Sequence, residues 1–209
     1  MPTLPPASLS YHPRIGTIAA VLGAYLLGTF PSALLVGRRS GFDPTAAGSQ
    51  NPGATNAYRL GGRRAGVAVL AFDVAKGAVA AGAGWALGGH GLGVACGAAS
   101  VVGHCLPVTR RFQGGKGVAT AAGAAAVLEP VVSLAVGVVF LVVARVGRRA
   151  SVASVVAAAA LPIGVALAGR PLREVATWAG VAALVVLRHR SNLARLVAGT
   201  EPALPDRDG

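Results

Sequence analysis

The chain has 209 residues, of which 54% are hydrophobic and only 12% are charged, and its mean hydropathy is +0.63. Soluble domains carry roughly 25% charged residues and disordered chains are polar, so this composition excludes a disordered chain. The formal net charge is +12, but too few charged groups remain to cover a water-facing surface and also coat a phosphate backbone, which argues against a nucleic-acid-binding protein. What remains is an integral membrane protein whose 30 glycines suit close helix packing in lipid.

The first predicted membrane span runs from Ile15 to Gly37, a stretch without a charged side chain. It is long enough to cross the roughly 30 Å hydrocarbon core. It is too long, and starts too late, for the apolar region of a typical signal peptide, and no cleavage site precedes a soluble domain. Residues 1–14 before it are expected to form a poorly ordered tail.

Six further apolar stretches follow along the chain, at residues 67–85, 91–108, 118–128, 131–144, 152–168 and 175–187. The sequence therefore predicts an all-α membrane protein, a polytopic bundle of about seven transmembrane helices with short amphipathic or re-entrant segments on the cytoplasmic side. Several stretches are short for a crossing, residues 118–128 above all, so a version with five spans and re-entrant pieces is the alternative. Residues 15–199 form a single domain, and residues 200–209 are expected to form a second poorly ordered tail.

Two cysteines, Cys96 and Cys105, fall on these stretches. If both lie on one helix, their Cα atoms are about 13.5 Å apart, which exceeds the roughly 7 Å that a disulfide allows. We expect two free, buried side chains.

Basic residues predict the orientation, because cytoplasmic loops carry an excess of Lys and Arg. With the N-terminus outside and seven spans, only Arg14, Arg170 and Arg173 fall in outer segments. The inner segments hold Arg38, Arg39, Arg59, Arg63, Arg64, Arg110, Arg111, Lys116, Arg145, Arg148, Arg149, Arg188, Arg190, Arg195 and Arg207. The asymmetry predicts a cytoplasmic C-terminus.

The first of four polar clusters occupies residues 48–59 and follows the first span. Small residues let backbone N–H groups converge, and neutral donors and one guanidinium add to them, which is what a phosphate requires. The candidate phosphate-binding residues are Ser49, Asn51, Gly53, Thr55, Asn56 and Arg59. The alternative is a flexible Gly/Asn loop that joins two spans.

The second cluster, residues 112–120, opens a helix and resembles half of a phosphate loop. Position 110 is Arg and position 117 is Gly, so the ATP-binding Walker pattern fails. Glycine amides, a helix N-terminus and a lysine still favour an anion. The candidates are Gly114, Gly115, Lys116, Gly117 and Thr120; the alternative is a basic loop that only obeys the charge bias.

The third cluster lies within the membrane. Asp73 and Lys76 are three positions apart, so they share a helix face and can pair. Ionisable residues inside a membrane face the bundle interior and are functional candidates, although a structural ion pair is the alternative. His104, nearby in the topology, is a candidate general base, a donor, or a packed neutral histidine.

The fourth cluster follows the last span. His189, Asn192 and Arg195 are spaced three apart and share one face if helical. Arg188 and Glu201 flank them, and Ser151 and Ser154, which open the sixth span, supply further hydroxyls. The alternative is a basic helix on an anionic membrane surface.

Taken in order, these motifs resemble a known family. They are Gly28-Thr29-Phe30-Pro31, the 48–59 loop, Gly103-His104-x-x-Pro107, the 112–120 loop and the tail from Arg188 to Glu201. Over about residues 15–201 the chain resembles the bacterial acyl-phosphate:glycerol-3-phosphate acyltransferase family (PlsY type). It departs from the family at Gln50, where Gly is usual, and after Asp43, where the usual Arg is missing.

The resemblance implies acyl transfer from acyl phosphate to the 1-hydroxyl of glycerol 3-phosphate, giving lysophosphatidate and phosphate, the first step of bacterial phospholipid synthesis. It implies His104, Lys116, Arg59, Asn192 and His189 as catalytic residues, with neither cofactor nor metal. It also implies a monomer in the bacterial plasma membrane, with its site at the cytoplasmic face and an association with an enzyme that makes acyl phosphate.

The residue chemistry agrees with this reaction. An acyl phosphate has a good leaving group, so positioning and charge stabilisation are what the protein must supply. No G-x-S-x-G motif is present, and no His is followed by Asp at the fifth position, as acyl-CoA-dependent glycerolipid acyltransferases require. The alternatives are a small membrane transporter of a phosphorylated anion, which predicts an inverted repeat and a midplane site, and a metal-dependent phosphoalcohol transferase, which needs several acids on one helix.

Overall fold

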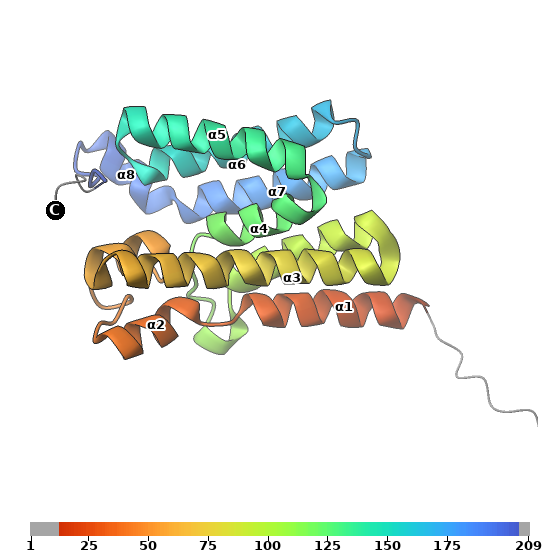
Figure 1. Cartoon of the computed structure of the whole chain (residues 1–209), viewed down its shortest axis with the longest axis horizontal. Coiled ribbons are helices and arrows are strands. Elements are labelled where there is room, and N and C mark those ends of the chain that lie inside the picture. Colours follow the sequence, from red (N-terminus) through yellow and green to blue (C-terminus); the bar gives the residue numbers. More distant parts are fainter. Residues whose placement is uncertain (1–12, 205–209) are drawn as a thin grey trace, which may run out of the picture.

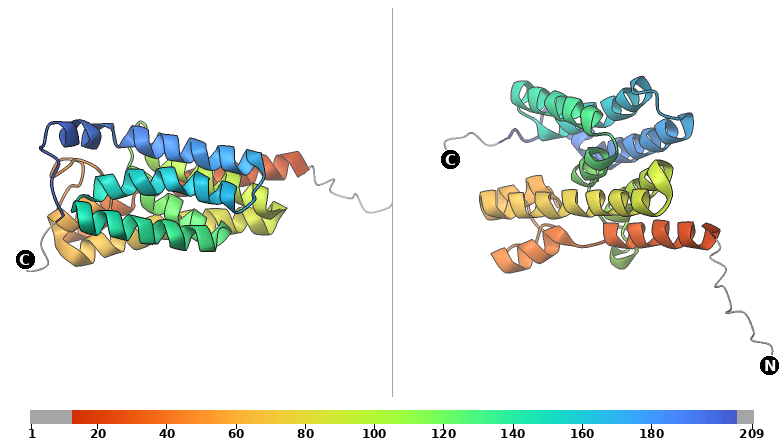
Figure 2. Two further views of the ribbon diagram at one scale, coloured as in Figure 1. Left: turned by 90° about the horizontal axis from the view of Figure 1, so that it is seen from above. Right: turned by 45° about the vertical axis from the view of Figure 1, so that its right-hand side comes forward.

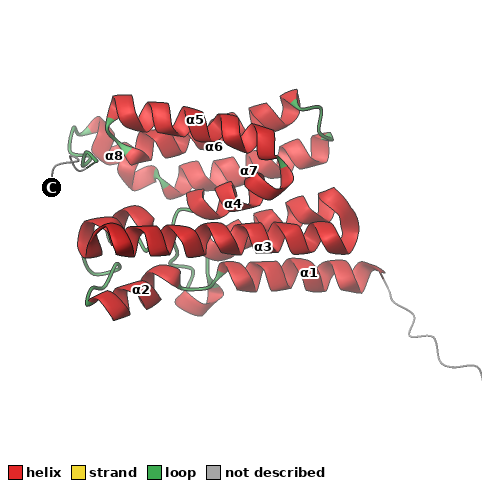
Figure 3. Ribbon diagram, viewed as in Figure 1, coloured by secondary structure: helices red, strands yellow, loops and turns green. Residues whose placement is uncertain are grey.

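The computed structural model describes residues 13–204, and in this part of the chain every regular element is a helix (Figures 1 and 3). The helices run in the order α1 (Pro13–Gly28), α2 (Ser32–Ser40), α3 (Ala54–Cys105), the 3₁₀ turn η1 (Val108–Arg110), α4 (Val118–Leu128), α5 (Pro130–Gly147), α6 (Ala150–Leu167), α7 (Leu172–Arg188) and α8 (Arg190–Val197). The all-α prediction is confirmed. The predicted N-terminal tail lies almost wholly outside the described residues.

The helices form two layers (Figures 1 and 2). Helices α1 and α2 lie along one side of α3, whereas α5, α6 and α7 form the other layer, and α4 lies between the two. The largest buried core joins both layers through α4 and is centred on Val101, Leu128, Val165 and Trp178. Both cysteines are buried and free, as predicted.

The first predicted span is interrupted. Residues 14–40 are long and apolar enough to cross a membrane, but Thr29, Phe30 and Pro31 separate α1 from α2. The single helix expected over this stretch is therefore corrected to two. Pro31 has no N–H to continue the helix, so the Leu27 carbonyl accepts the Phe30 amide instead. The Phe30 carbonyl accepts the Ser32 amide at 3.0 Å and Lys76 Nζ at 3.4 Å.

The second and third predicted spans are the two arms of α3. Gly88 and Gly89 have non-helical backbone angles, and Gly89 has a φ of 79°, a region that glycine adopts without steric cost. The chain reverses there, so the two arms lie side by side (Figure 1). A second break at Gly62 (φ 73°) sets off a short opening segment, residues 54–61, which was expected to be loop.

The remaining predicted spans agree closely with α4 to α7, with ends that differ by a few residues. Helix α4 has 11 residues and is about 16.5 Å long, roughly half of the hydrocarbon thickness. It crosses α3 at very close range, because a Cβ on Gly77 would overlap the backbone of Thr120, and a Cβ on Gly123 would overlap the backbone of Val74. Glycine at these contacts lets the two backbones touch.

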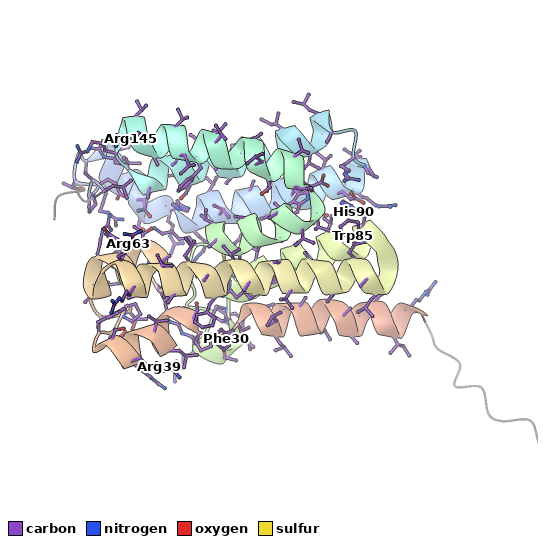
Figure 4. The ribbon with its side chains drawn as sticks, in the orientation of Figure 1. Phe30, Arg39, Arg63, Trp85, His90 and Arg145 are labelled. Atoms are coloured by element: carbon purple, nitrogen blue, oxygen red, sulfur yellow. The ribbon has the colours of Figure 1, made fainter. Side chains whose placement is uncertain are left out.

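Basic side chains gather at one end of the bundle. Figure 4 shows Arg39, Arg63 and Arg145 at that end, whereas Trp85 and His90 lie at the other. Of the predicted C-terminal tail, residues 200–204 lie within the described residues, and residues 205–209 lie outside them. Glu201 is 7% exposed, and the Leu204 amide donates to the Arg148 carbonyl at 2.7 Å.

Candidate active site

A cavity of about 760 Å³ lies between the two layers and is lined by α3, α4, α5, α6, α7 and α8 together with the loops before α3 and α4. Its polar lining contains members of all four sequence clusters. They are Ser49, Asn51, Gly53, Thr55, Asn56, Arg59, Asp73, His104, Lys116, Gly117, Ser151, Ser154, His189, Asn192 and Glu201. Segments separated by up to about 150 positions thus converge on one space.

A chain of hydrogen bonds joins the second and fourth clusters. Lys116 Nζ donates to Asn192 Oδ1 at 2.5 Å, and Asn192 Nδ2 donates to Glu201 Oε1 at 2.7 Å. Arg195 Nε donates to the other oxygen of Glu201 at 2.9 Å. Because α8 presents Asn192 and Arg195 on the same face, Glu201 can bind both, and Asn192 is held with its amide oxygen toward Lys116. We call these four residues the open network.

Charge in the open network is tuned by burial. Burial, together with the neighbouring Arg195 and Arg59, lowers the pKa of Lys116 to about 8, although Glu201 acts in the opposite direction. For Glu201, burial raises the pKa, but hydrogen bonds from Asn192 and Arg195 outweigh it, and the pKa is lowered overall. Near neutral pH the site therefore holds a cationic Lys116 beside an anionic Glu201.

His189 lies between α7 and α8 and is 2% exposed. Its Nδ1 lies 2.7 Å from the carbonyl oxygen of Val185, which can only accept, so Nδ1 carries the proton. Burial lowers the pKa of His189. The ring is then neutral at pH 7, its Nε2 is a hydrogen-bond acceptor, and His189 is among the residues that line the cavity.

The glycine loop before α4 is positioned by Arg188. This side chain donates from Nη2 to the Gly114 carbonyl at 2.6 Å and from Nε to the Gly115 carbonyl at 3.1 Å. The backbone N–H of Gly115 donates a hydrogen bond to the His104 carbonyl oxygen at 3.0 Å. Of the three glycines predicted in this loop, Gly117 lines the cavity; the contacts of Gly114 and Gly115 hold the loop that presents Lys116.

The loop before α3 is organised by Asn56, which is 1% exposed. Its Nδ2 donates to the carbonyls of Pro44 and Ala47, and its Oδ1 accepts from the Ser49 amide at 2.9 Å. Asn56 was predicted as a phosphate ligand, but its side-chain amide forms hydrogen bonds that hold the loop. Ser49, Thr55 and Arg59 line the cavity from the same segment.

The same loop contains both departures from the family pattern. Asp43 Oδ1 accepts the amide of Thr45 at 2.8 Å and its hydroxyl at 2.6 Å, and these bonds lower the pKa of Asp43. Thr45 thus satisfies the acid where the usual Arg is missing. Gln50 has a φ of 54°, in the left-handed region that favours glycine.

Two serines from α6 and one threonine from α4 were predicted as donors. Ser154 Oγ donates to the Ala150 carbonyl at 2.7 Å. Ser151 lines the cavity, and its buried hydroxyl lies beside Glu201 without a hydrogen bond of good geometry to it. Thr120 is fully buried on α4, packed against Gly77 of α3, and is not among the residues that line the cavity.

A second polar group, the closed network, consists of Ser32, Asp73, Lys76 and His104. Lys76 Nζ lies 2.9 Å from Asp73 Oδ1 and 2.7 Å from His104 Nδ1, and Ser32 Oγ donates to Asp73 Oδ1 at 2.6 Å. An ammonium can only donate, so His104 Nδ1 accepts and the neutral ring carries its proton on Nε2. The lone pair that a general base needs is already occupied, and this geometry favours the packed histidine.

The sequence analysis missed two parts of the site. Ser32 was not singled out, because its partner Asp73 is 41 positions away. The second part is the apolar wall of the cavity, which continues from the polar lining. It is formed by small residues of α4 and larger ones of α5 and α6, including Ala121, Ala125, Leu134, Val138, Leu141, Ala158 and Leu161. The sequence signal that could have indicated this wall is the succession of small side chains on α4 and larger side chains on α5 and α6.

A protein-family model and several described proteins are similar in sequence to this chain. The sequence model of a family described as glycerol-3-phosphate acyltransferase matches residues 18–199. A glycerol-3-phosphate acyltransferase of Trichlorobacter lovleyi is 39% identical over 182 residues, covering 87% of this chain and 94% of the relative. One of Burkholderia ambifaria is 43% identical over 195 residues, covering 91% and 92%.

Two solved structures are similar to this chain in fold. The glycerol 3-phosphate form of PlsY (YgiH), an integral membrane glycerol 3-phosphate acyltransferase, superimposes with a TM-score of 0.87 at 34% identity, covering 91% of this chain and 96% of that one. The lysophosphatidic acid form of the same protein gives a TM-score of 0.85.

Proposed function

This chain belongs to the glycerol-3-phosphate acyltransferase family, as a multi-pass membrane protein of the PlsY type, and from that premise we propose that its acyl donor is an acyl phosphate. The products are then 1-acyl-glycerol 3-phosphate and inorganic phosphate. The observation that carries the proposal is a single cavity that joins a cationic polar end to an apolar wall. Such a space suits one fully polar substrate and one substrate with a phosphate head and a hydrocarbon tail.

The phosphate groups bind at the polar end. Lys116 and Arg59 supply the positive charge, and Ser49, Thr55 and Ser151 supply hydroxyl donors. Two phosphorylated reactants require several converging donors, and hydrogen bonds from cations to phosphate are stronger than neutral ones. Asn51, Gly53 and Gly117 line the same end; the Gly53 amide already donates to the Asn51 carbonyl at 2.9 Å, so Gly117, which has no side chain, is the glycine that offers backbone N–H groups to a phosphate.

Glycerol 3-phosphate is oriented by the fourth cluster. The Asn192 amide, fixed between Lys116 and Glu201, and the acceptor Nε2 of His189 face the same cavity. Arg195 contributes by holding Glu201, and Arg188 contributes by holding the loop of Lys116. The fatty chain lies along the apolar wall between α4, α5 and α6.

The transfer step requires little beyond this placement. The 1-hydroxyl oxygen attacks the acyl carbonyl carbon, the bond from that carbon to the phosphate oxygen breaks, and inorganic phosphate leaves. The hydroxyl proton passes to a phosphate oxygen, because the Nδ1 of His104 is engaged by Lys76. Lys116 and Arg59 stabilise the charge that moves onto the leaving phosphate. No nucleophilic side chain, metal or cofactor is needed for this step.

The basic end of the bundle supports a location of the site at the cytoplasmic face of a bacterial plasma membrane, with the N-terminus outside. A water-soluble substrate reaches the cavity from that side, and the tail of the other remains close to lipid. We expect a monomer to be active, and we expect it to receive its donor from an enzyme that makes acyl phosphate.

The test is a direct assay of the purified full-length protein with labelled glycerol 3-phosphate. Palmitoyl phosphate should give labelled lysophosphatidate, whereas palmitoyl-CoA at the same concentration should give none. Product from palmitoyl-CoA alone would overturn the donor assignment and leave the family membership intact. Arg39→Ala, an exposed basic residue far from the cavity lining, is the matched control for charge loss.

A further inference from the structure

The apolar wall of the cavity contains one residue whose small size is not explained by the packing of the protein itself. Helix α5 lines the cavity with residues spaced three and four positions apart, and four of them form a stripe along one helix face. They are Pro130, Leu134, Gly137 and Leu141. Gly137 has no side chain and lies between the two leucines, so it forms a notch in the wall.

The space beside Gly137 is empty. Outside the neighbouring turns of its own helix, no heavy atom of the described residues lies within 4 Å of the position that a Cβ would occupy. Other helix glycines differ, because a Cβ on Gly123 would overlap the backbone of Val74, and one on Gly164 would lie 2.6 Å from Val132 Cγ1. Gly137 does not have a positive φ either. Since glycine weakens a helix interior and neither packing nor backbone conformation requires it here, the empty space itself is the feature to explain.

The notch lies on the path of a chain that extends from the polar end of the cavity. Arg145, in the last turn of α5, lies at the basic end of the bundle (Figure 4), so Leu141 is the first residue of the stripe that such a chain meets. Gly137 follows about 6 Å further along the helix, and Pro130 lies about 10.5 Å beyond Gly137. Leu161 lines the cavity from α6, is 6% exposed and packs into the largest buried core. A chain that runs along α5 as far as Pro130 must pass the notch.

The other walls of the cavity have small side chains at many positions. Ala122 and Ala126 of α4 line the cavity one helical turn apart and are exposed. Ala157 and Ala158 of α6 also line it. The large side chains on the stripe of α5 therefore narrow the space, and Gly137 is the position on that stripe where α5 leaves the most room.

We propose that Gly137 determines which acyl tails the enzyme accepts, because its missing side chain lets a long, unbranched tail run along α5 from the polar end to Pro130. The proposal rests on the function proposed above, since it takes the apolar wall to be the place of the tail. A short tail ends before Gly137 and does not use the notch. A large side chain at position 137 closes the space between Leu141 and Leu134 and so restricts the enzyme to short donors.

The test compares donors of different tail length with the purified full-length protein at saturating glycerol 3-phosphate. The quantity measured is the ratio of kcat/KM for palmitoyl phosphate to kcat/KM for butyryl phosphate. In Gly137→Leu this ratio should fall roughly 5- to 150-fold, the cost of forcing a chain into an overfilled space. Gly137→Ala should lower it less, in proportion to the smaller side chain. Ala122→Leu, which narrows the cavity from α4, should lower it in the same direction.

Gly180→Leu is the matched control. Gly180 lies within α7 and is exposed, it has no heavy atom within 4 Å of its Cβ position, and it is not among the residues that line the cavity. Its ratio should equal that of the parent. An unchanged ratio in Gly137→Leu, or an equal fall in Gly180→Leu, overturns the proposal.

The donor assignment and the role of Gly137 can fail separately. If the parent uses acyl-CoA and not acyl phosphate, the same pair of tails as CoA thioesters gives the ratio, and the role of Gly137 is decided without the donor assignment. The ratio compares two donors in one preparation, so a misfolded fraction lowers both rates and cancels. If Gly137→Leu is inactive with both donors, the ratios of Gly137→Ala and Ala122→Leu decide the question, and parental ratios in both overturn the proposal.

Discussion

The closed network is buried and the open network is partly buried; each is built around a lysine and a carboxylate, yet they differ in whether the N–H groups of the lysine all have partners inside the protein. In the closed network, Lys76 meets Asp73, His104 and the Phe30 carbonyl, so its three N–H groups have partners inside the protein. In the open network, Asn192 accepts one of the three N–H groups of Lys116 within the described residues. Lys116 lines the cavity, as does Ser151, whose buried hydroxyl has no hydrogen-bond partner among the described residues.

This difference separates stability from binding. A buried charge with a full set of internal partners contributes to the fold, because removing one partner leaves the other uncompensated. A partly buried cation whose N–H groups are not all paired inside the protein is positioned to bind an anion. The lowered pKa of Lys116 reflects the free-energy cost of burying its charge. The same substitution in the two networks should therefore be read out by different measurements.

The largest effect is expected for Lys76→Met. The substitution leaves Asp73, which is 2% exposed, as a buried carboxylate without its lysine partner, although Ser32 still donates to it. Breaking a buried pair in this way costs about 3–5 kcal/mol of stability. Thermal unfolding in detergent should register the loss, and the double variant Lys76→Met with Asp73→Asn should recover part of it.

Lys116→Met is the matched control, since it makes the same change in the open network. Its unfolding temperature should stay close to that of the parent. Equal destabilisation by both substitutions would contradict the distinction between the two networks.

Loss of activity is expected next in size, from Lys116→Ala and from Arg59→Ala. Each removes one charged contact to phosphate, worth about 1.5–3 kcal/mol, and kcat/KM for glycerol 3-phosphate should fall roughly 10- to 150-fold. Steady-state kinetics with palmitoyl phosphate measures this. Near-parental kinetics in either variant would remove that residue from the phosphate site.

The third prediction concerns pH and follows from the pKa of Lys116, which burial lowers to about 8. The cationic form dominates below that pH, and the phosphate of the substrate is already fully ionised above about pH 6–7. As pH rises through 8, kcat/KM should therefore fall, by about tenfold between pH 7 and 9.

Lys116→Arg sharpens this experiment, because arginine stays protonated over the whole range. Its kcat/KM is expected to be lower than that of the parent but flat between pH 7 and 9. If the variant shows the same alkaline decline as the parent, the titrating group is not Lys116.

The helices differ in how closely their boundaries could be predicted from the sequence. Helices α4 to α7 were predicted closely because Glu129-Pro130, Arg148-Arg149 and Pro171 interrupt apolar runs locally. The break between α1 and α2 was not predicted, because no charge marks it and Lys76, which donates a second hydrogen bond to the Phe30 carbonyl, is 46 positions away.

The site residues divide in the same way. The clusters of Lys116 and Asn192 were found from local composition, since glycines and cations stand next to one another in the chain. The role of Asn56 was not predicted, because its side-chain amide donates to two backbone carbonyls that come close to it only when the loop is folded. Glu201 was assigned to the site, yet residue 200 was placed at the start of a tail, because its partners lie on α8 and its burial depends on them.

The smallest effect is expected at the departure from the family pattern, Gln50. Its φ of 54° costs a residue with a side chain about 1–2 kcal/mol, whereas glycine's greater freedom in the unfolded chain costs about 0.5–1 kcal/mol. Gln50→Gly should therefore stabilise the protein by about 0.5–1 kcal/mol, a rise of roughly 1–4 °C in Tm for a chain of this size. Gln113→Gly is the matched control, since Gln113 is also an exposed loop residue but does not have a positive φ; it should lower Tm. If both substitutions lower Tm equally, the left-handed conformation at Gln50 carries no strain, and the loop that presents Ser49 tolerates this departure at no cost.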